Sequence, residues 1–299
     1  MSSFVDSTTY EGKPLYDFFA TIIDSEYSSR SDWKNLSSVK DKVLVPQLSL
    51  SNILQTGEYC DFSATGSVTL SRKEVEVCPY YVNLEICKKD IEPTFLSAKM
   101  NAGQLNGEWA PSEMTQFLID YIKEQVLYDL EYATWQGSTA SCEGGLVKQA
   151  GADVTVGTVS AATVSITAAN VIAQIQAVLD ATPAVVREAN DFVLYVSRGI
   201  AHSFRTAVNT LTVPYFKADE KPSMMWSGYT IKETPGLGAK EMFAARLSNL
   251  WNVNDLGSDE QRLLIVDMTN TTAEPKARIV LQCKYVAAYG IGAEVVLYS

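Results

Sequence analysis

The chain has 299 residues, of which 46% are hydrophobic and 20% are charged, the proportions of an ordinary folded protein and not of a disordered one. With 35 acidic residues against 24 basic ones, its formal net charge is −11. A protein that grips nucleic acid through the phosphate backbone needs a basic face, so this charge balance disfavours that role. A single histidine, His202, excludes sites that need two histidines, such as an HExxH metal helix.

The cysteines form an odd set without a CxxC motif, which disfavours a secreted disulfide framework and a zinc cluster. We therefore expect reduced thiols at Cys60, Cys78, Cys87, Cys142 and Cys283. The N-terminus lacks a basic stretch followed by an apolar run, and no segment approaches the ~18 apolar residues of a membrane span. The sequence predicts a soluble protein made in a reducing compartment, with no membrane partner.

No motif in the chain supplies a catalytic or ligand-binding set. Residues 236–240 resemble a phosphate-binding loop, but Lys240 is followed by Glu241, where a Walker loop needs Ser or Thr. We expect a turn there. The GxSxG and DxDxDG patterns are both missing from the sequence. The sequence therefore predicts no catalytic residue, no cofactor and no metal site, and it favours a structural, non-enzymatic role.

Residues 1–42 are polar and rich in serine, and they predict an extended arm with one short amphipathic helix after Pro14. The apolar side chains of this helix are Leu15, Phe18, Phe19, Ile22 and Ile23. Because such an arm has too little apolar surface to fold alone, we expect a neighbouring molecule to hold it in place.

From Val43 to Ile86 the apolar residues recur at period two, which predicts a long two-stranded ribbon with a polar tip at 57–66. The apolar positions on its strands are Leu48, Leu50, Val68 and Leu70. Their parity changes at Val75 and again after Pro79, and each change predicts a bulge or bend. An isolated two-stranded ribbon is only marginally stable in water, so this one must lie against another surface, either its own domain or another molecule.

The clearest helix opens at Pro111 and Ser112 and stops at Gly137, a residue that adopts the left-handed C-terminal conformation easily. At 1.5 Å per residue it is a rod of roughly 38 Å. We expect one broad stripe of this helix to be buried. Its members are Met114, Phe117, Leu118, Tyr121, Ile122, Tyr128, Tyr132 and Trp135.

The small, glycine-rich residues 138–165 predict a loop or loose hairpin and a domain boundary. Thr167 is then expected to cap a second helix that Pro183 ends. A buried strand at 192–196 and a third helix from Ser197 complete a compact α/β unit. Further strands are predicted at 229–233, 242–247, 263–267, 278–287 and 295–298.

This order of elements resembles the major capsid proteins of tailed double-stranded DNA bacteriophages, which have the Hong Kong 97-type fold. The stretch ending EYATWQG is similar to that family's spine helix, and NVIAQIQAVLDATP with DFVLYVSRGIAHSF resembles its axial domain. The segment RIVLQCKYVAAYGIGAEVVLYS resembles the closing strands. The implied fold is α+β, with an N-arm (1–42), an extended β-hairpin loop (43–78), a peripheral domain with the spine helix (79–137 and 263–299) and an axial α/β domain (138–262).

The resemblance implies a protein that assembles as hexamers and pentamers into an icosahedral shell around double-stranded DNA, without sequence-specific contacts. It also implies a portal and decoration proteins as partners, and a place in the virion after assembly in the host cytoplasm. Many members of the family carry an N-terminal scaffolding segment rich in charged helical sequence. This chain has none, so we expect a separate scaffolding protein. Lys73 lies on the ribbon, but no partner residue signals a covalent crosslink.

The candidate site is an interface between subunits. Its residues are Leu15, Phe18, Phe19, Leu48, Leu50, Tyr59, Phe62, Val68 and Leu70. Two alternatives stay open. An encapsulin-type nanocompartment would use the same fold around cargo enzymes, and a cytosolic α/β enzyme would place its active site near His202 or the 235–240 turn.

Overall fold

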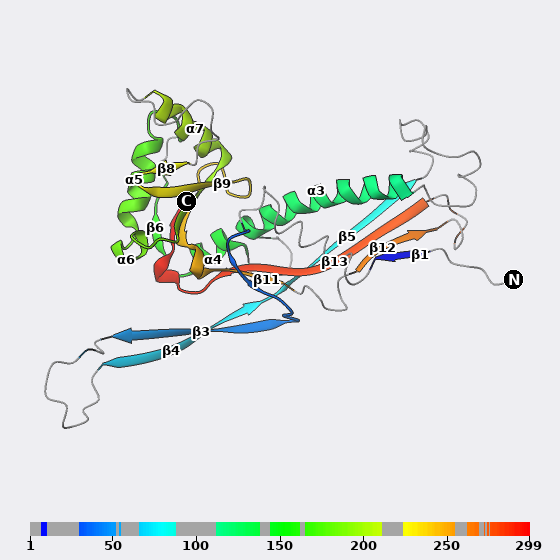
Figure 1. Ribbon diagram of the computed structural model, residues 1–299, viewed down its shortest axis with the longest axis horizontal. Helices are drawn as coiled ribbons and strands as arrows, with labels where there is room; N and C mark the ends of the chain where they lie inside the picture. Colours follow the sequence, from blue (N-terminus) through cyan, green and yellow to red (C-terminus); the bar gives the residue numbers. More distant parts are fainter. Residues whose placement is uncertain are drawn as a thin grey trace.

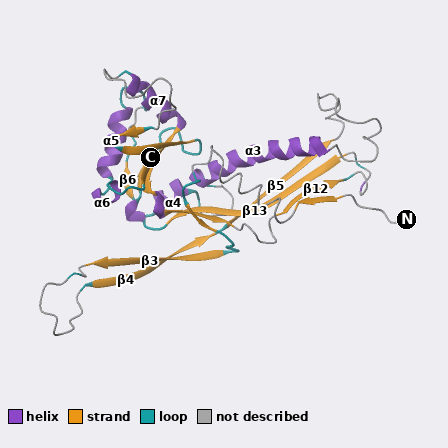
Figure 2. Ribbon diagram, viewed as in Figure 1, coloured by secondary structure: helices purple, strands orange, loops and turns teal. Residues whose placement is uncertain are grey.

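The computed structural model describes residues 7–10, 30–51, 54, 66–87, 112–137, 144–161, 165–210, 224–254, 262–268, 272, 274 and 276–299. These residues form a compact α/β unit that holds the C-terminus, a long helix lying along a long sheet, and a two-stranded ribbon that projects from the body (Figure 1). Helices and strands are mixed along the chain (Figure 2), so the predicted α+β class is confirmed.

The α/β unit is built on a six-stranded sheet with the strand order β6-β14-β10-β7-β9-β8. Its strands are β6 (Gly157–Val159), β7 (Phe192–Ser197), β8 (Met225–Trp226), β9 (Tyr229–Thr234), β10 (Met242–Arg246) and β14 (Val296–Tyr298). The strands predicted at 192–196, 229–233, 242–247 and 295–298 are confirmed to within one residue at each end, although the last of them was expected in the peripheral domain. The last strand of the 263–299 segment, β14, pairs with β10 and β6, and so it lies in this sheet.

Three helices belong to the unit: α5 (Val171–Ala181), α6 (Ala184–Arg187) and α7 (Arg198–Asn209). Ser197 caps α7 as predicted, because its Oγ accepts a hydrogen bond from the Ile200 N–H. The cap predicted at Thr167 is wrong. Thr167 opens a turn in which its own N–H donates to Asn170 Oδ1 at 2.7 Å, and α5 begins only after Asn170.

Both faces of this sheet are buried within the chain. Leu194 and Val196 of β7 pack with α5 and α7 on one face. Val193 and Tyr195, which alternate with them, pack with Trp135 from the end of the long helix on the other face. A strand covered on both sides is expected to be apolar throughout, and every residue of β7 is buried.

The long sheet has the strand order β1-β12-β13-β11-β2, with β5 along the other edge of β13. Its strands are β1 (Ser7–Tyr10), β2 (Lys34–Leu36), β5 (Cys78–Cys87), β11 (Leu250–Asn254), β12 (Arg262–Asp267) and β13 (Lys276–Tyr289). The alternation predicted for the long C-terminal strand is confirmed, with Ile279 and Leu281 buried and Arg278 and Gln282 exposed.

The long helix, α3 (Ser112–Gln136), lies along this sheet and stops at Gly137, whose φ is +84°. A Cβ at Gly137 would approach the backbone nitrogen of Gly145 to 2.3 Å, so both the backbone angle and the space require glycine. A short helix, α4 (Leu146–Ala152), follows in the segment predicted as a loop. That part of the loop prediction is therefore wrong.

The buried stripe of α3 differs from the predicted one. Its buried apolar residues in the described C-terminal half are Ile122, Val126, Leu130 and Trp135. Tyr128 and Tyr132 are 56% and 54% exposed, so their expected burial is wrong. The sheet covers only one side of the helix, and the apolar residues of this sequence extend beyond that side.

The end of the N-terminal arm is anchored in its own chain. Arg30 is fully buried, with its Nε 3.2 Å from Glu131 Oε2 on α3. Trp33 donates from Nε1 to the Tyr195 hydroxyl at 2.7 Å and packs edge to face against Trp135. The strand β2 that follows pairs with β11. The chain itself therefore holds the root of the arm, where a neighbouring molecule was expected.

Two further features concern the expected environment of the protein. Cys78 is disulfide-bonded and Cys87 is a free thiol, so the expectation of reduced thiols throughout is wrong for Cys78. Spacing in the sequence does not reveal which cysteines a fold brings together. Among the described residues, no helix has the length and hydropathy needed to cross a membrane.

Candidate interaction surface

The polar groups singled out in the sequence do not gather into a catalytic or metal site. Within the described part of the chain, no group of three or more His, Cys, Asp and Glu residues is placed to hold a metal ion. His202 is exposed on α7. Residues 235–240 form a turn between β9 and β10, as predicted. Gly236 of this turn lies against α3, where a Cβ would come within 2.4 Å of the Trp135 ring.

The ribbon consists of β3 (Lys42–Ser51) and β4 (Ser67–Glu76), paired antiparallel. Their register runs without a break from the pair of Lys42 and Glu76 to the pair of Ser51 and Ser67. Of the bulge or bend predicted at Val75, the bulge is therefore wrong. The parity of the apolar residues changes because the ribbon is covered on one face near the body and carries apolar residues on the opposite face farther out.

The inner face of the ribbon is buried at its root. Val45 and Val75 are 7% and 3% exposed and pack in one cluster with Val253, Val286 and Ala288 of the long sheet. Lys42 forms ion pairs with Glu74 at 2.7 Å and Glu76 at 3.4 Å on the neighbouring strand. Hydrogen bonds from the Lys42 ammonium to these two side chains raise the pKa of Lys42.

The outer face of the ribbon carries charged residues near the root and exposed apolar residues farther out. Val68 and Leu70, two of the predicted interface residues, are 68% and 61% exposed. The register pairs Leu48 with Leu70 and Leu50 with Val68, so the four positions lie on one face of the ribbon. We call this the outer ribbon face, defined by positions 44, 48, 50, 68 and 70.

The structure does not describe the side chains of the remaining predicted interface residues. Leu15, Phe18, Phe19, Tyr59 and Phe62 lie outside the described residues, and the side chains of Leu48 and Leu50 do as well. Sequence reasoning missed Leu44, which is 54% exposed on the outer ribbon face, and Leu54, which is 91% exposed beyond the end of β3. Leu44 lies between two valines, so the local sequence does not show which of the three faces solvent.

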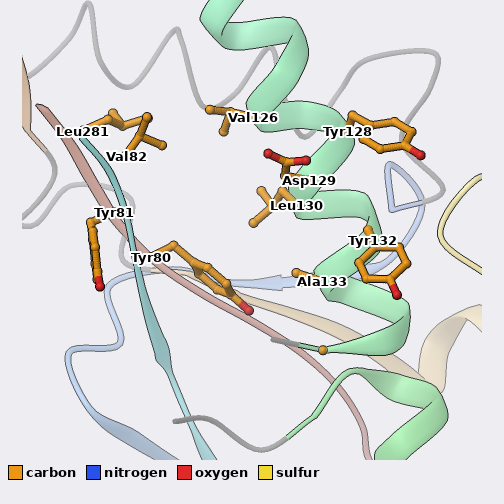
Figure 3. Close-up of a pocket in the computed structure, with 11 residues that line it drawn as sticks. Tyr80, Tyr81, Val82, Val126, Tyr128, Asp129, Leu130, Tyr132, Ala133 and Leu281 are labelled. Atoms are coloured by element: carbon orange, nitrogen blue, oxygen red, sulfur yellow. The ribbon is translucent and has the colours of Figure 1, made fainter. Parts of the chain in front are cut away.

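A second apolar surface lies between α3 and the long sheet. It is a groove of about 600 Å³ with Tyr80 and Val82 of β5, Val126 and Leu130 of α3, and Leu281 of β13 along its walls (Figure 3). Three tyrosines, Tyr81, Tyr128 and Tyr132, also line it and are 72%, 56% and 54% exposed. No pattern in the sequence pointed to this groove, because it is formed by segments that are far apart in the chain.

Together these surfaces can bury apolar area against another molecule. Fully burying one Val or Leu side chain contributes roughly 1.5–3 kcal/mol, so the outer ribbon face could contribute several kcal/mol to an association. Contiguous exposed apolar patches of this kind mark interaction sites on soluble proteins. The arrangement therefore suits binding of a protein surface better than chemistry on a small molecule.

No protein-family model and no curated protein matches the sequence. Solved structures do match the fold. A chain from the satellite phage P4 procapsid, whose particle includes a size determination protein, is 12% identical with a TM-score of 0.62, covering 95% of this chain and 98% of its own. A chain from the capsid of a native GTA particle is 12% identical with a TM-score of 0.62, covering 100% and 93%. A chain from a virus-like particle of Pyrococcus furiosus is 8% identical with a TM-score of 0.56, covering 96% and 98%.

These matches extend over nearly the whole chain and over nearly the whole of each matched chain, so the similarity concerns the complete fold. The resemblance drawn from the sequence is confirmed at this level: the chain has the Hong Kong 97-type fold of phage capsid proteins.

Proposed function

We propose that this chain is a major capsid protein, which self-assembles as hexamers and pentamers into an icosahedral shell enclosing double-stranded DNA. The fold it shares with phage capsid chains supports the general role. The observation that carries the proposal is the outer ribbon face. The ribbon projects from the body (Figure 1), and Leu44, Val68 and Leu70 on this face are exposed. A second copy of the chain can cover that face in a closed, symmetric assembly.

The proposed parts of the subunit keep the division expected from the sequence: an N-arm (1–42), an extended loop (43–78), a peripheral domain around α3 (79–137 and 263–299) and an axial domain (138–262). Two strands cross this division, because β14 pairs within the sheet of the α/β unit and β11 pairs within the long sheet. The arm residues Leu15, Phe18 and Phe19 and the tip residues Tyr59 and Phe62 are proposed to reach neighbouring subunits with the outer ribbon face. The role is structural, and we propose no enzymatic activity.

The charge of the chain supports a shell that holds DNA without gripping it. The chain has 35 acidic residues against 24 basic ones, so on balance it repels phosphates and packaged DNA would move with little hindrance. We propose the further partners that this role requires: a separate scaffolding protein, a portal and decoration proteins. The proposed location is the virion, after assembly in the host cytoplasm.

A nanocompartment shell of the encapsulin type is the second candidate. It is favoured by the similarity to the virus-like particle of Pyrococcus furiosus, which covers 96% of this chain. The two candidates differ in content. Particles purified from their producing cells and treated with nuclease would contain protected double-stranded DNA in the first case and a cargo protein in the second. The third hypothesis, a cytosolic enzyme, has no observation in its favour among the described residues.

The test of assembly compares two neighbouring residues of β4 that lie on opposite faces of the ribbon. Leu70→Asp places a charge on the outer ribbon face, and Thr69→Asp places the same charge on the other face. Purified proteins would be examined by light scattering and electron microscopy. We expect closed particles from the wild type and from Thr69→Asp, and only small oligomers from Leu70→Asp, because burying an unpaired carboxylate is costly.

Two outcomes would count against the proposal. A wild-type protein that stays a monomer at every concentration and salt, with the scaffolding protein of its own source supplied, would rule out a shell. Closed particles of normal size from Leu70→Asp would remove the outer ribbon face from the interface.

A further inference from the structure

The ribbon leaves the body of the subunit at the pair formed by Val45 and Lys73. Val45 is buried against the long sheet, and Lys73 is its partner in the register. Beyond this pair, every ribbon residue whose side chain is described is exposed. The direction of the projecting part is therefore set by contacts at or before this pair, as far as the described residues go.

Lys73 contacts the body through an aromatic ring. Its Nζ lies 3.4 Å from the centre of the ring of Tyr289, the last residue of β13. A cation over the face of a tyrosine is attracted by the negative potential of the ring, and the attraction grows when water is kept away. The Tyr289 ring is 1% exposed, so water reaches little of it.

Tyr289 is itself held in position by α4. Its hydroxyl donates a hydrogen bond to Asp153 Oδ2 at 2.9 Å and lies 3.2 Å from the carbonyl oxygen of Gln149. Asp153 also accepts from the Thr155 N–H at 2.9 Å. Burial opposes ionisation of Asp153, but the hydrogen bonds from Thr155 and Tyr289 and the charge of Lys73 outweigh it, so the pKa of this carboxyl is lowered. The negative charge therefore stays close to the ammonium.

The same residues line an open hollow of about 370 Å³, together with Lys148. The ammonium thus lies between the ribbon and a surface with free space beside it, and it can leave the ring without moving any buried side chain. Separating one long side chain from a ring costs much less free energy than opening the valine cluster at the root, because the flexible stem of a lysine can turn its ammonium into water.

We propose that Lys73, Tyr289 and Asp153 form a latch that fixes the direction of the ribbon in the free subunit and opens when the ribbon is carried to another direction. The valine cluster at the root acts as the pivot. The latch belongs to the subunit alone, whereas its use during shell assembly rests on the proposed function.

The latch is tested on dilute subunits by measuring the distance between two spin labels. The labels are placed by a non-canonical amino acid at Thr69 on the ribbon and at Glu188 after α6, so that native thiols do not interfere. We expect one narrow distance distribution in the wild type. Lys73→Met keeps most of the side-chain length but removes the charge, and we expect it to broaden the distribution at least twofold.

Two matched variants serve as controls. Lys73→Arg keeps a cation over the ring, and it is expected to preserve the narrow distribution. Lys42→Met removes a cation that pairs with Glu74 and Glu76 on the neighbouring ribbon strand, and it is expected to leave the distribution narrow. All variants should melt within about 2 °C of the wild type, which shows that the pivot and core are intact. A narrow wild-type-like distribution in Lys73→Met, or equal broadening in Lys42→Met, would overturn the latch.

Assembly is measured separately in the same proteins. We expect Lys73→Met to give a wider range of particle diameters than the wild type. A ribbon without a fixed orientation in the free subunit can contact neighbouring subunits in more than one geometry. Particles of wild-type uniformity would overturn the use of the latch in assembly. If no variant forms particles, the wild type included, even with the scaffolding protein of its own source supplied, the proposed function fails. The distance measurement still decides whether the latch exists.

Discussion

In the α/β unit, the chain covers both faces of its own sheet: α5 and α7 pack on one side of β7, and Trp135 and Trp33 pack on the other. In the ribbon, the chain covers only the inner face, through Val45 and Val75, and leaves Val68 and Leu70 in solvent. Apolar side chains are thus buried within the subunit in the α/β unit, whereas on the outer ribbon face they stay exposed and can be buried only by another molecule.

The comparison separates residues that make the subunit fold from residues that make subunits associate. Substitutions in the self-covered region should lower the free energy of unfolding, since they leave a cavity or an unpaired buried group. Substitutions on the outer ribbon face should leave unfolding almost unchanged. The following predictions break or sharpen this separation, and they are ordered by the expected change in the unfolding free energy of the subunit.

Trp135→Ala should have the largest effect. Trp135 is fully buried and has ring contacts with Trp33, Tyr195 and Phe243 at centroid distances of 5.7, 5.0 and 5.5 Å. Removing a buried Trp side chain costs about 3–5 kcal/mol. Urea unfolding of the subunit would measure the loss. The exposed Tyr132 on the same helix is the control, and its change to Ala should cost less than about 0.5 kcal/mol. Equal losses in the two variants would contradict the observed burial.

The buried ion pair of Arg30 and Glu131 comes next. Arg30→Met leaves the Glu131 carboxylate buried without its cation and should cost about 3 kcal/mol. In the double variant Arg30→Met/Glu131→Met no charge remains to be desolvated, so most of that loss should return. Urea unfolding of Arg30→Met, Glu131→Met and the double variant gives the interaction free energy between the two side chains. If the double variant were less stable than either single variant, packing and not charge would account for the stability contributed by Arg30 and Glu131.

Asp191 gives a pH-dependent test in the α/β unit. Burial opposes its ionisation, but hydrogen bonds from the Ser248 N–H at 3.1 Å and Arg246 Nε at 3.0 Å outweigh it and lower its pKa to about 2. A lowered pKa stabilises the folded state above the unfolded-state pKa near 4, and this stability is lost as the pH falls towards 2.

Asp191→Asn should therefore cost about 1–2 kcal/mol at pH 7, after allowance for partial exposure of the carboxylate. The difference from the wild type should shrink between pH 4 and pH 2. Urea unfolding at pH 7, 5, 3 and 2.5 would measure it. A difference that stays constant over this range would mean that the hydrogen-bond geometry, and not ionisation, carries the effect.

The smallest change in unfolding is expected for Leu44→Ser on the outer ribbon face, at less than about 0.5 kcal/mol, because this side chain is already 54% exposed. Its neighbour Val45, 7% exposed on the inner face, should lose about 2 kcal/mol when changed to Ser. The concentration needed for assembly should rise for Leu44→Ser all the same. An unchanged assembly threshold would place Leu44 outside the interface.

Much of the α/β unit and of the long helix could be predicted from the sequence, because these elements carry strong local signals. Gly137 ends α3 as expected, and the all-apolar run of β7 identified a strand covered on both sides. The elements β1, β2 and β6 were missed. Each has only three or four residues, too few for a periodic pattern, and each is held by a partner strand far along the chain.

The candidate site was predictable only in part. Period two picked out Val68 and Leu70, but it could not say that their face is exposed while that of Val75 is covered, since both patterns look apolar. The change of parity was therefore read as a bulge that the register does not contain. The exposed Tyr128 and Tyr132 were misplaced for the same reason: hydrophobicity does not tell which side of a helix the sheet will cover.

The burial of Arg30 has a consequence for the time course of biosynthesis. Its carbonyl oxygen accepts a hydrogen bond from Asn252 Nδ2, a residue 222 positions later, and its guanidinium lies over the ring of Tyr285 near the end of the chain. A nascent polypeptide that has already released the ribbon from the ribosome still lacks both of these groups. These contacts of Arg30 can form only once translation is nearly finished. Under the proposed function, subunits would therefore associate as complete molecules.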